Sequence, residues 1–174
     1  TYADMTTWNT AAANVQSFID GIRQSDYDSG RYNKKSIENL KSMLDTLQNE
    51  ADTTVKKQLQ KDAEAKMKTM VDEINTAMTT AKTETGTLSD MTKLNSKLAE
   101  AKKFYNREKS NVGTEIGNYS KEKMDELMNV IDSSSLLTNQ DPQSDIDKAV
   151  TDLDKAIINV KFSLVQKEKI ILTD

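Results

Sequence analysis

Carboxylates are the residues of this sequence whose number and spacing could best support catalysis. Four aspartates stand close together in the C-terminal part of the chain: Asp145, Asp147, Asp152 and Asp154. Two carboxylates held at a fixed separation in a cleft can act as the acid and base of a glycosidase. Lysines alternate with these aspartates, however, and the segment has helical apolar spacing. We therefore predict a charged, solvated helix face here and no active site.

A second acidic pattern, at 26–30, resembles the beginning of a calcium-binding loop. An EF-hand loop needs an oxygen ligand at its fifth position, glycine at the sixth and glutamate at the twelfth. Those positions hold Gly30, Arg31 and Ile37. The pattern fails as a calcium site, and we predict a turn that separates two helices.

Three further features could contact a ligand, but each has a structural interpretation that we prefer. Trp8 could stack on a sugar ring, yet it lies on the apolar stripe of a predicted helix and is expected in the core. The Asn-Tyr-Ser sequon at Asn118 is a match expected by chance. Four methionines could form an adaptable binding surface but fall on predicted buried stripes: Met43, Met67, Met70 and Met78. No catalytic, cofactor-binding or metal-ligating residue is predicted.

Composition narrows the chemistry further. The chain lacks cysteine and histidine, which removes thiol nucleophiles, disulfides, thiolate zinc sites and the side chain most used for proton transfer near neutrality. The net charge of −4 comes from interspersed charges of both signs, so no nucleic-acid partner is expected. No run of about 18 apolar residues is present, so no membrane insertion is expected. We predict that the protein is not an enzyme and holds no cofactor.

Apolar residues recur at helical spacing along most of the chain. Scarce glycine and proline, five and one in 174 residues, favour long uninterrupted helices. The spacing predicts six helices, with apolar stripes at 5–22, 37–47, 55–78, 91–105, 124–131 and 146–160. We expect the sixth helix to end near Gln166 and the residues after it, including Ile170, Ile171 and Leu172, to be extended.

The second half of the chain repeats the first. Segments 30–45 and 117–132 share glycine, tyrosine, lysine, leucine and aspartate in register, 87 residues apart. The first helices align at the same offset, which pairs Phe18 with Tyr105. The third helices align at a slightly shorter offset, which pairs Met70 with Leu153. Internal repetition of this kind indicates repeated structural modules.

Each copy of the 30–45 segment carries the signals of a helix start. Asn33 and Ser120 are predicted N-caps, whose side chains accept a backbone N–H of the first turn. Tyr32 and Tyr119 precede these caps, where an apolar side chain packs back on the helix as a hydrophobic staple. A surface ligand contact is the alternative role for the two tyrosines.

Caps are also predicted for the other helices. Asp141 reads as the N-cap of the sixth helix, with Pro142 as its first residue. Asp52, Thr53 or Thr54 could cap the third helix. Ser89 is predicted to cap the fourth.

These features predict an all-α protein of two tandem antiparallel three-helix bundles that form an elongated rod. The first unit is expected at 1–86 and the second at 87–164. The last residues, 165–174, are a C-terminal tail or the start of a following domain.

The second unit, over roughly residues 90–160, resembles the FIVAR module of bacterial surface proteins. The stretches "LNSKLAEAKKFY", "NYSKEKMDELMNVID" and "QSDIDKAVTDLDKAI" carry the resemblance. The matching residues are Leu94, Leu98, Ala101, Lys102, Tyr119, Leu127, Val130, Gln143, Ala149, Leu153, Ala156 and Ile157. The first unit is a looser version, with Ala13, Tyr32, Leu40 and Leu44 in place and a longer, methionine-rich third helix.

The resemblance implies a three-helix module of secreted, often wall-anchored, multidomain bacterial proteins. Such modules occur as repeats in adhesins, some of which bind host matrix proteins, and as spacers beside carbohydrate-active domains. We therefore expect an extracellular, non-catalytic spacer or adhesion module next to neighbouring domains of a larger chain. The alternative is a binding module for a host matrix protein or a glycan, accessory to a carbohydrate-active protein.

Overall fold

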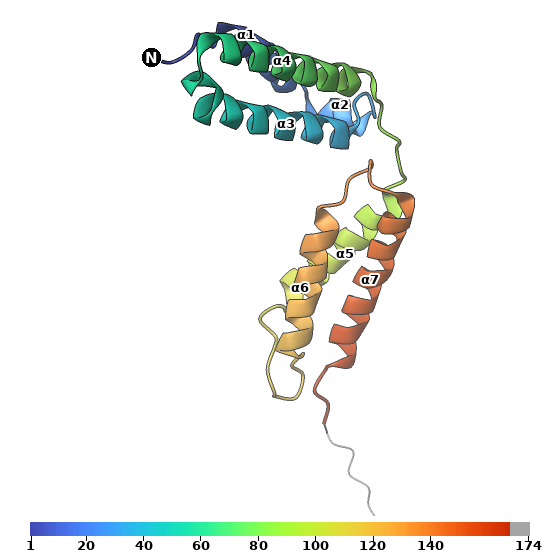
Figure 1. Cartoon of the computed structure of the whole chain (residues 1–174). Helices are drawn as coiled ribbons and strands as arrows, with labels where there is room; N and C mark the ends of the chain where they lie inside the picture. The colour runs from blue at the N-terminus through green and yellow to red at the C-terminus, as the bar shows by residue number, and fades with distance from the viewer. Residues whose placement is uncertain (168–174) are drawn as a thin grey trace, which may run out of the picture. The chain divides into compact units, whose positions relative to one another are not determined.

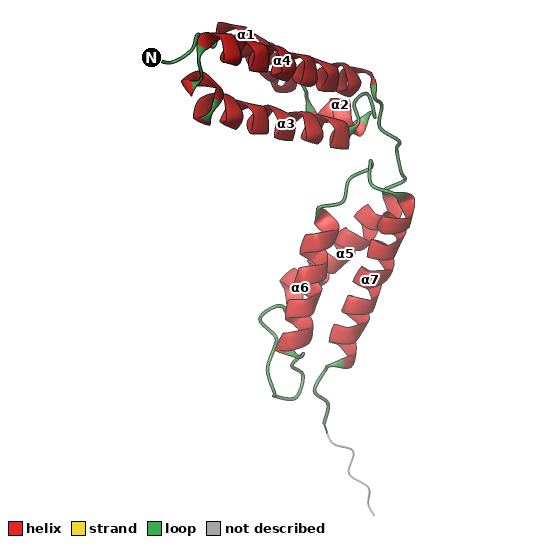
Figure 2. Ribbon diagram, viewed as in Figure 1, coloured by secondary structure: helices red, strands yellow, loops and turns green. Residues whose placement is uncertain are grey.

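The computed structural model describes residues 1–167. Within them the chain forms seven α-helices, one short 3-10 helix and no β-strand (Figure 1, Figure 2). The prediction of an all-α protein is confirmed. The chain divides into two compact units, Thr1–Leu88 and Ser89–Asp174, which are described separately below.

Three long helices of the first unit pack against one another: α1 (Thr6–Asp20), α3 (Lys34–Thr53) and α4 (Gln60–Thr83). Each is amphipathic, and its apolar stripe faces the other two. The largest fully buried side chains of this core are Trp8, Val15, Ile37, Leu40, Met67, Met70 and Ile74. Met43, by contrast, is 38% exposed, so its predicted place on the buried stripe was wrong.

The connection between α3 and α4 differs from the prediction. Helix α3 runs through Thr53, a 3-10 helix η1 (Val55–Lys57) follows, and α4 begins only at Gln60. Val55 is buried because it closes this end of the core, whereas Leu59 is 78% exposed at the N-cap of α4. The predicted caps at 52–54 do not cap α4: Asp52 and Thr53 belong to the end of α3, and Thr54 stands between α3 and η1.

A short helix, α2 (Gln24–Asp28), occupies the first residues of the predicted turn at 26–30. Asp26 makes it possible, because its Oδ2 accepts the backbone N–H of Arg23 at 2.8 Å in the first turn. The chain then reverses at Gly30, whose φ of +74° lies in the left-handed region that glycine tolerates.

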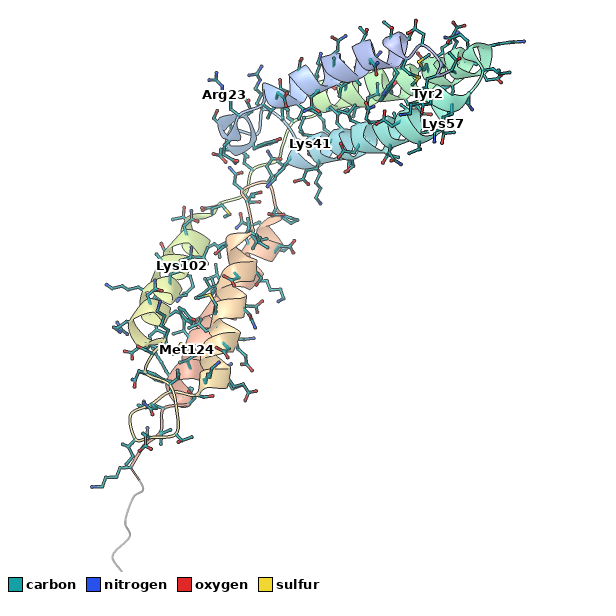
Figure 3. The ribbon with its side chains drawn as sticks, turned by 90° about the vertical axis from the view of Figure 1, so that its left-hand side faces the viewer. Tyr2, Arg23, Lys41, Lys57, Lys102 and Met124 are labelled. Atoms are coloured by element: carbon teal, nitrogen blue, oxygen red, sulfur yellow. The ribbon has the colours of Figure 1, made fainter. Side chains whose placement is uncertain are left out.

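The second unit has three helices that likewise pack against one another: α5 (Thr92–Glu108), α6 (Lys121–Ser135) and α7 (Gln143–Phe162). Its largest fully buried side chains are Leu94, Met124, Leu127, Ile146 and Leu153. Figure 3 shows Met124 inside the unit and Lys102 on its outer face.

Three predicted helix ends in the second unit were wrong. Ser89 does not cap α5: its hydroxyl donates to the carbonyl of Asp141 at 2.7 Å. Pro142 is itself the N-cap of α7, because the Asp141 carboxylate turns back to accept the N–H of Thr138. Helix α7 ends at Phe162 and not near Gln166. The expectation for Ile170, Ile171 and Leu172 lies outside the described residues.

Candidate functional site

The glycine–tyrosine turn that occurs once in each unit is an anchor of the core. Tyr32 packs edge-on against Phe18 in the first unit, with ring centroids 5.6 Å apart. Tyr119 does the same with Phe104 in the second, at 5.8 Å. Edge-to-face packing of this kind stabilises a fold beyond simple burial. The anchor role of the tyrosines is confirmed.

The predicted caps beside these tyrosines are confirmed as well. Asn33 accepts the N–H of Ser36 at 3.1 Å, and Ser120 accepts the N–H of Lys123 at 3.3 Å. Each cap fixes where its helix begins, and the tyrosine just before it is thereby held against the core.

Cationic side chains cover each aromatic pair. Lys82 lies 5.3 Å from the Phe18 ring centroid and Arg31 lies 5.1 Å from that of Tyr32. In the second unit Arg107 and Lys161 each lie 5.5 Å from the Phe104 ring. These are stabilising cation–π contacts at an exposed surface. The rings of Phe18, Tyr32 and Phe104 are therefore each contacted by a cationic side chain of the same unit.

The aromatic pairs also correct the sequence alignment of the two halves. Phe104, and not Tyr105, takes the place of Phe18, so the first helices are 86 residues apart. The tripeptide Asp-Met-Thr, whose threonine begins each helix, agrees, at 4–6 and 90–92. Met5 and Met91 are the N-cap residues of α1 and α5, with similar backbone angles.

The N-terminal segment of the first unit is held by a two-point clasp. Ala3 donates its backbone N–H to the carbonyl of Lys56 at 2.7 Å. Asp4 donates its N–H to Oε1 of Gln60, the first residue of α4, at 2.8 Å. Gln60 then donates its own Nε2 to Glu64 at 3.2 Å, which fixes the orientation of its amide. We call the two bonds from Ala3 and Asp4 the N-terminal clasp.

The second unit has the same N-terminal clasp. Ser89 donates its N–H to the carbonyl of Asn139 at 2.7 Å. Asp90 donates its N–H to Oε1 of Gln143, the first residue of α7, at 2.7 Å. Gln143 donates Nε2 to Asp147 at 3.0 Å, as Gln60 does to Glu64. The donor residues are 86 apart and the acceptor residues 83 apart, in line with the predicted shorter offset of the third helices.

The aspartate of each N-terminal clasp also orders the first turn of the following helix. Asp4 Oδ1 accepts the N–H and the hydroxyl of Thr6 at 2.9 and 2.6 Å, and Asp90 Oδ1 accepts the N–H of Thr92 at 2.9 Å. These hydrogen bonds from Thr6 and Thr92 favour the ionised carboxylate, so they hold the pKa of Asp4 and of Asp90 below the ordinary range.

The segment that leaves the first unit is held at the opposite end. Gly86 donates its N–H to the carbonyl of Gly30 at 2.9 Å, and Asn33 donates its N–H to Glu84 at 3.0 Å. The Glu84 carboxylate also accepts the hydroxyl of Ser36. We call the bonds of Gly86 and Glu84 to the start of α3 the C-terminal clasp.

The two clasps also show the direction of the helices. Because Ala3 is held near Lys56 and Gly86 near Gly30, α3 runs opposite to α1 and α4.

A C-terminal clasp is present in the second unit too. Val165 donates its N–H to the carbonyl of Asn118 and accepts the N–H of Gly117, both at 2.8 Å. Ser163 accepts the N–H of Ser120 through its hydroxyl at 3.0 Å. The glycine–tyrosine turn therefore has a second role in both units, as the surface on which the departing chain is held.

Open grooves lie between helices of each unit. One, of about 460 Å³, runs between α6 and α7. Small side chains such as Ala149 and Ala156 form its floor. Two grooves of about 310 and 320 Å³ lie between α1 and α3. These are shallow surfaces that could accept a side chain or a sugar ring.

The carboxylates singled out on α7 do not converge. Asp152 pairs with Lys148 at 2.5 Å and Asp154 with Lys97 at 3.1 Å, both across exposed surface. The hydrogen bonds from Lys97 to Asp154 and Glu100 raise the pKa of its ammonium. The prediction of a charged outer face is confirmed. Within residues 1–167 no group of three or more acidic side chains is placed to hold a metal ion.

The remaining sequence candidates have structural roles. Asp26 is bound to Arg23 and Arg31, and Asp28 accepts Gln24, so this pair does not form a calcium loop. Trp8 is fully buried, as predicted, and its indole N–H donates to Gln48 at 3.0 Å.

The sequon asparagine is part of a hydrogen-bonded loop. Asn118 donates to Asn111 Oδ1 at 2.9 Å and accepts the N–H of Glu115 at 3.1 Å. Met67 and Met70 are buried in the core as predicted, and Met78 packs against it.

Sequence reasoning missed the two glutamines of the N-terminal clasps. In the sequence, Gln143 stands out only as part of the FIVAR-like pattern, and Gln60 lies inside a helix that is expected to start earlier. The Asp-Met-Thr tripeptide, aligned at the offset of 86, would have pointed to both clasps.

Comparisons with known proteins leave the family open: no protein-family model, no curated protein and no solved structure matches the chain. In the part of the chain that the structure describes, no helix is long and apolar enough to cross a lipid bilayer.

Proposed function

We propose that this chain is a tandem pair of FIVAR-type three-helix modules that acts as a non-catalytic spacer or adhesion module in a bacterial surface or secreted protein. In this proposal each unit is an antiparallel bundle, and the two units form an elongated rod between neighbouring domains. The observation that carries the proposal is the repetition of both clasps, because a unit that fixes both ends of its own chain is suited to use in series.

The positions of the clasps support the spacer role. The N-terminal clasp lies where α3 gives way to α4, and the C-terminal clasp lies where α3 begins. The incoming and departing segments are therefore separated by the length of α4, whose 24 residues rise about 36 Å. A module of this design adds length to a chain with each copy.

The connection between the units is short. Residues 84 and 86 are bonded to the first unit and residues 89 and 90 to the second, so only Thr87 and Leu88 lie between the two clasps. Leu88 packs over Gly30, with Cδ2 3.2 Å from where a Cβ would stand. We propose that this short connection has little freedom.

Two measurements test the proposal. Small-angle X-ray scattering of the whole chain should give the pair-distance distribution of an elongated particle, and a compact particle would refute the rod. Antibodies against the chain should label intact cells of the source organism and lose their target after brief protease treatment. Labelling only after lysis would refute the extracellular location.

The groove between α6 and α7 favours one alternative, a binding module for a host matrix protein or a glycan. The floor of the groove is apolar, and its rim carries the charged residues Lys155 and Glu126. It would therefore suit a ligand that has both apolar and polar groups. Ser133→Trp would fill the groove from its exposed rim, and Ser96→Trp on the outside of α5 is the matched control. Binding to matrix proteins or a glycan array that only Ser133→Trp abolishes supports this alternative; no binding by the unmodified chain rejects it.

A further inference from the structure

We infer that the N-terminal clasp makes each unit a force-transmitting element, in which tension along the chain passes through a single helix. Asp4 is bonded to Gln60, the first residue of α4, and the departing chain begins where α4 ends, at Thr83. The clasp therefore joins the incoming chain directly to the helix from which the chain leaves. Residues 5–59, with α1 and α3, lie outside this direct path.

The second unit has the same connection. Asp90 is bonded to Gln143, the first residue of α7, and the chain leaves α7 after Phe162. The two cores differ in sequence, yet the same pair of contacts joins the incoming chain to the same helix end in both units. A contact needed only for packing has no reason to join the two segments that carry the chain in and out.

The physical consequence concerns how a unit yields under load. Without the clasp, tension on Ala3 acts on the first turn of α1 and peels it from the core one turn at a time. With the clasp, the same tension must first break the bonds to Lys56 and Gln60. Both bonds must break together, because they hold the neighbouring residues Ala3 and Asp4 of the incoming segment. The clasp therefore delays peeling of α1.

The inference rests on the proposed tandem arrangement, since tension reaches a unit only through its chain ends. The experiment below concerns one unit alone. Failure of the scattering or labelling experiments would leave its result standing, and its failure would leave the rod and the extracellular location untouched.

Single-molecule pulling in two geometries tests the inference, and the absence of native cysteine allows handles to be placed at will. In the first geometry, handles at Thr1→Cys and Thr87→Cys load the N-terminal clasp. In the second, handles at Lys61→Cys and Thr87→Cys pull on α4 from the residue after Gln60 and leave the clasp outside the load path. Both use the full chain.

Gln60→Ala removes the side-chain bond of the clasp and keeps the backbone bond from Ala3 to Lys56, and Gln16→Ala is the matched control. Gln16 makes the same type of bond within its helix, to Asp20 at 2.8 Å, as Gln60 makes to Glu64, but it has no bond to the incoming chain. The comparison therefore separates the effect of losing the bond to Asp4 from the effect of losing a side-chain bond on a helix surface.

In the first geometry Gln60→Ala should unfold about fivefold faster than the unmodified chain at the same load, the effect of one hydrogen bond of about 1 kcal/mol. Gln16→Ala should be unchanged. In the second geometry the rates of Gln60→Ala and the unmodified chain should agree. The inference is overturned if Gln60→Ala has no effect in the first geometry, or if it accelerates unfolding equally in both.

Discussion

Replacing Gly30 by alanine should destabilise the first unit more than replacing Gly117 by alanine destabilises the second. Both glycines precede the anchoring tyrosine by two residues and both have positive φ, +74° and +90°. Their surroundings differ. A Cβ on Gly30 would stand 2.8 Å from the carbonyl oxygen of Gly86, whereas a Cβ on Gly117 would meet no atom within 4 Å.

The magnitudes follow from this difference. A left-handed conformation costs an alanine about 1–2 kcal/mol, and both variants bear that cost. At Gly30 the added methyl also displaces the Gly86 segment, which loses a hydrogen bond worth about 1 kcal/mol and the contact of Leu88. We expect a loss of about 2–4 kcal/mol for Gly30→Ala and about 1–2 kcal/mol for Gly117→Ala. The entropy that alanine removes from the unfolded chain is common to both and cancels in the comparison.

The lone tryptophan makes the assay specific. Trp8 is fully buried in the first unit, so its fluorescence follows that unit, whereas circular dichroism at 222 nm follows the helices of both. Gly30→Ala should lower the midpoint of the fluorescence transition by roughly 4–8 °C for each kcal/mol lost. Gly117→Ala should leave that transition in place and shift only the remainder of the dichroism signal. Equal losses in the two variants would refute the steric reasoning, and a fluorescence shift in Gly117→Ala would show that the units do not unfold independently.

Three further predictions have defined outcomes. Trp8→Ala should cost the first unit about 3–5 kcal/mol and leave the second unit's dichroism transition unchanged; a loss under about 1 kcal/mol would contradict its place in the core. Ser120→Ala should cost the second unit about 1 kcal/mol in urea unfolding, and Ser144→Ala, an exposed residue in the first turn of α7, should cost much less. Asp4→Asn combined with Asp90→Asn should flatten the acid side of the stability profile. The folded pKa of both carboxyls is lowered, so their contribution is present above about pH 4 and is lost as the pH falls; a variant with an unchanged melting-temperature profile would contradict this.

The long helices could be predicted because their apolar stripes are regular. The starts of α3 and α6 could be predicted because each cap bonds to a residue only three positions away. Asn33 and Ser120 needed only the neighbouring residues to be recognised. The connections were predicted less well, because their hydrogen bonds join residues about 50 positions apart. Ser89 looks like a cap in sequence, but its hydroxyl bonds to the carbonyl of Asp141, and only the folded chain brings the two together.

The same contrast between local and long-range contacts explains how much of the candidate site could be predicted from the sequence. The paired charges on α7 were predicted from alternating aspartates and lysines, a pattern that the helix itself makes visible. The clasps were not, because Gln60 and Gln143 act on segments that precede them by more than fifty residues. The error in the third helix start added to this, since it places Gln60 inside the helix instead of at its first residue.

A comparison of what the two units share and what they do not indicates where the repeat is constrained. Their cores are filled differently: Trp8 corresponds to Leu94, and Met70 to Leu153. The contacts at the chain ends recur with the same residue types, aspartate to glutamine at one end and a glycine turn to the departing chain at the other.

A buried position tolerates any apolar side chain of suitable volume once its neighbours adjust. A clasp tolerates little, because a backbone N–H needs an acceptor at a fixed place and a left-handed turn needs glycine. The residues that fix how the chain arrives and leaves are therefore among those retained in both halves, beside core residues such as Leu40 and Leu127. That is the pattern expected of a unit whose task is performed through its ends, and it is the reason the clasps, before the grooves, are the first target for mutagenesis.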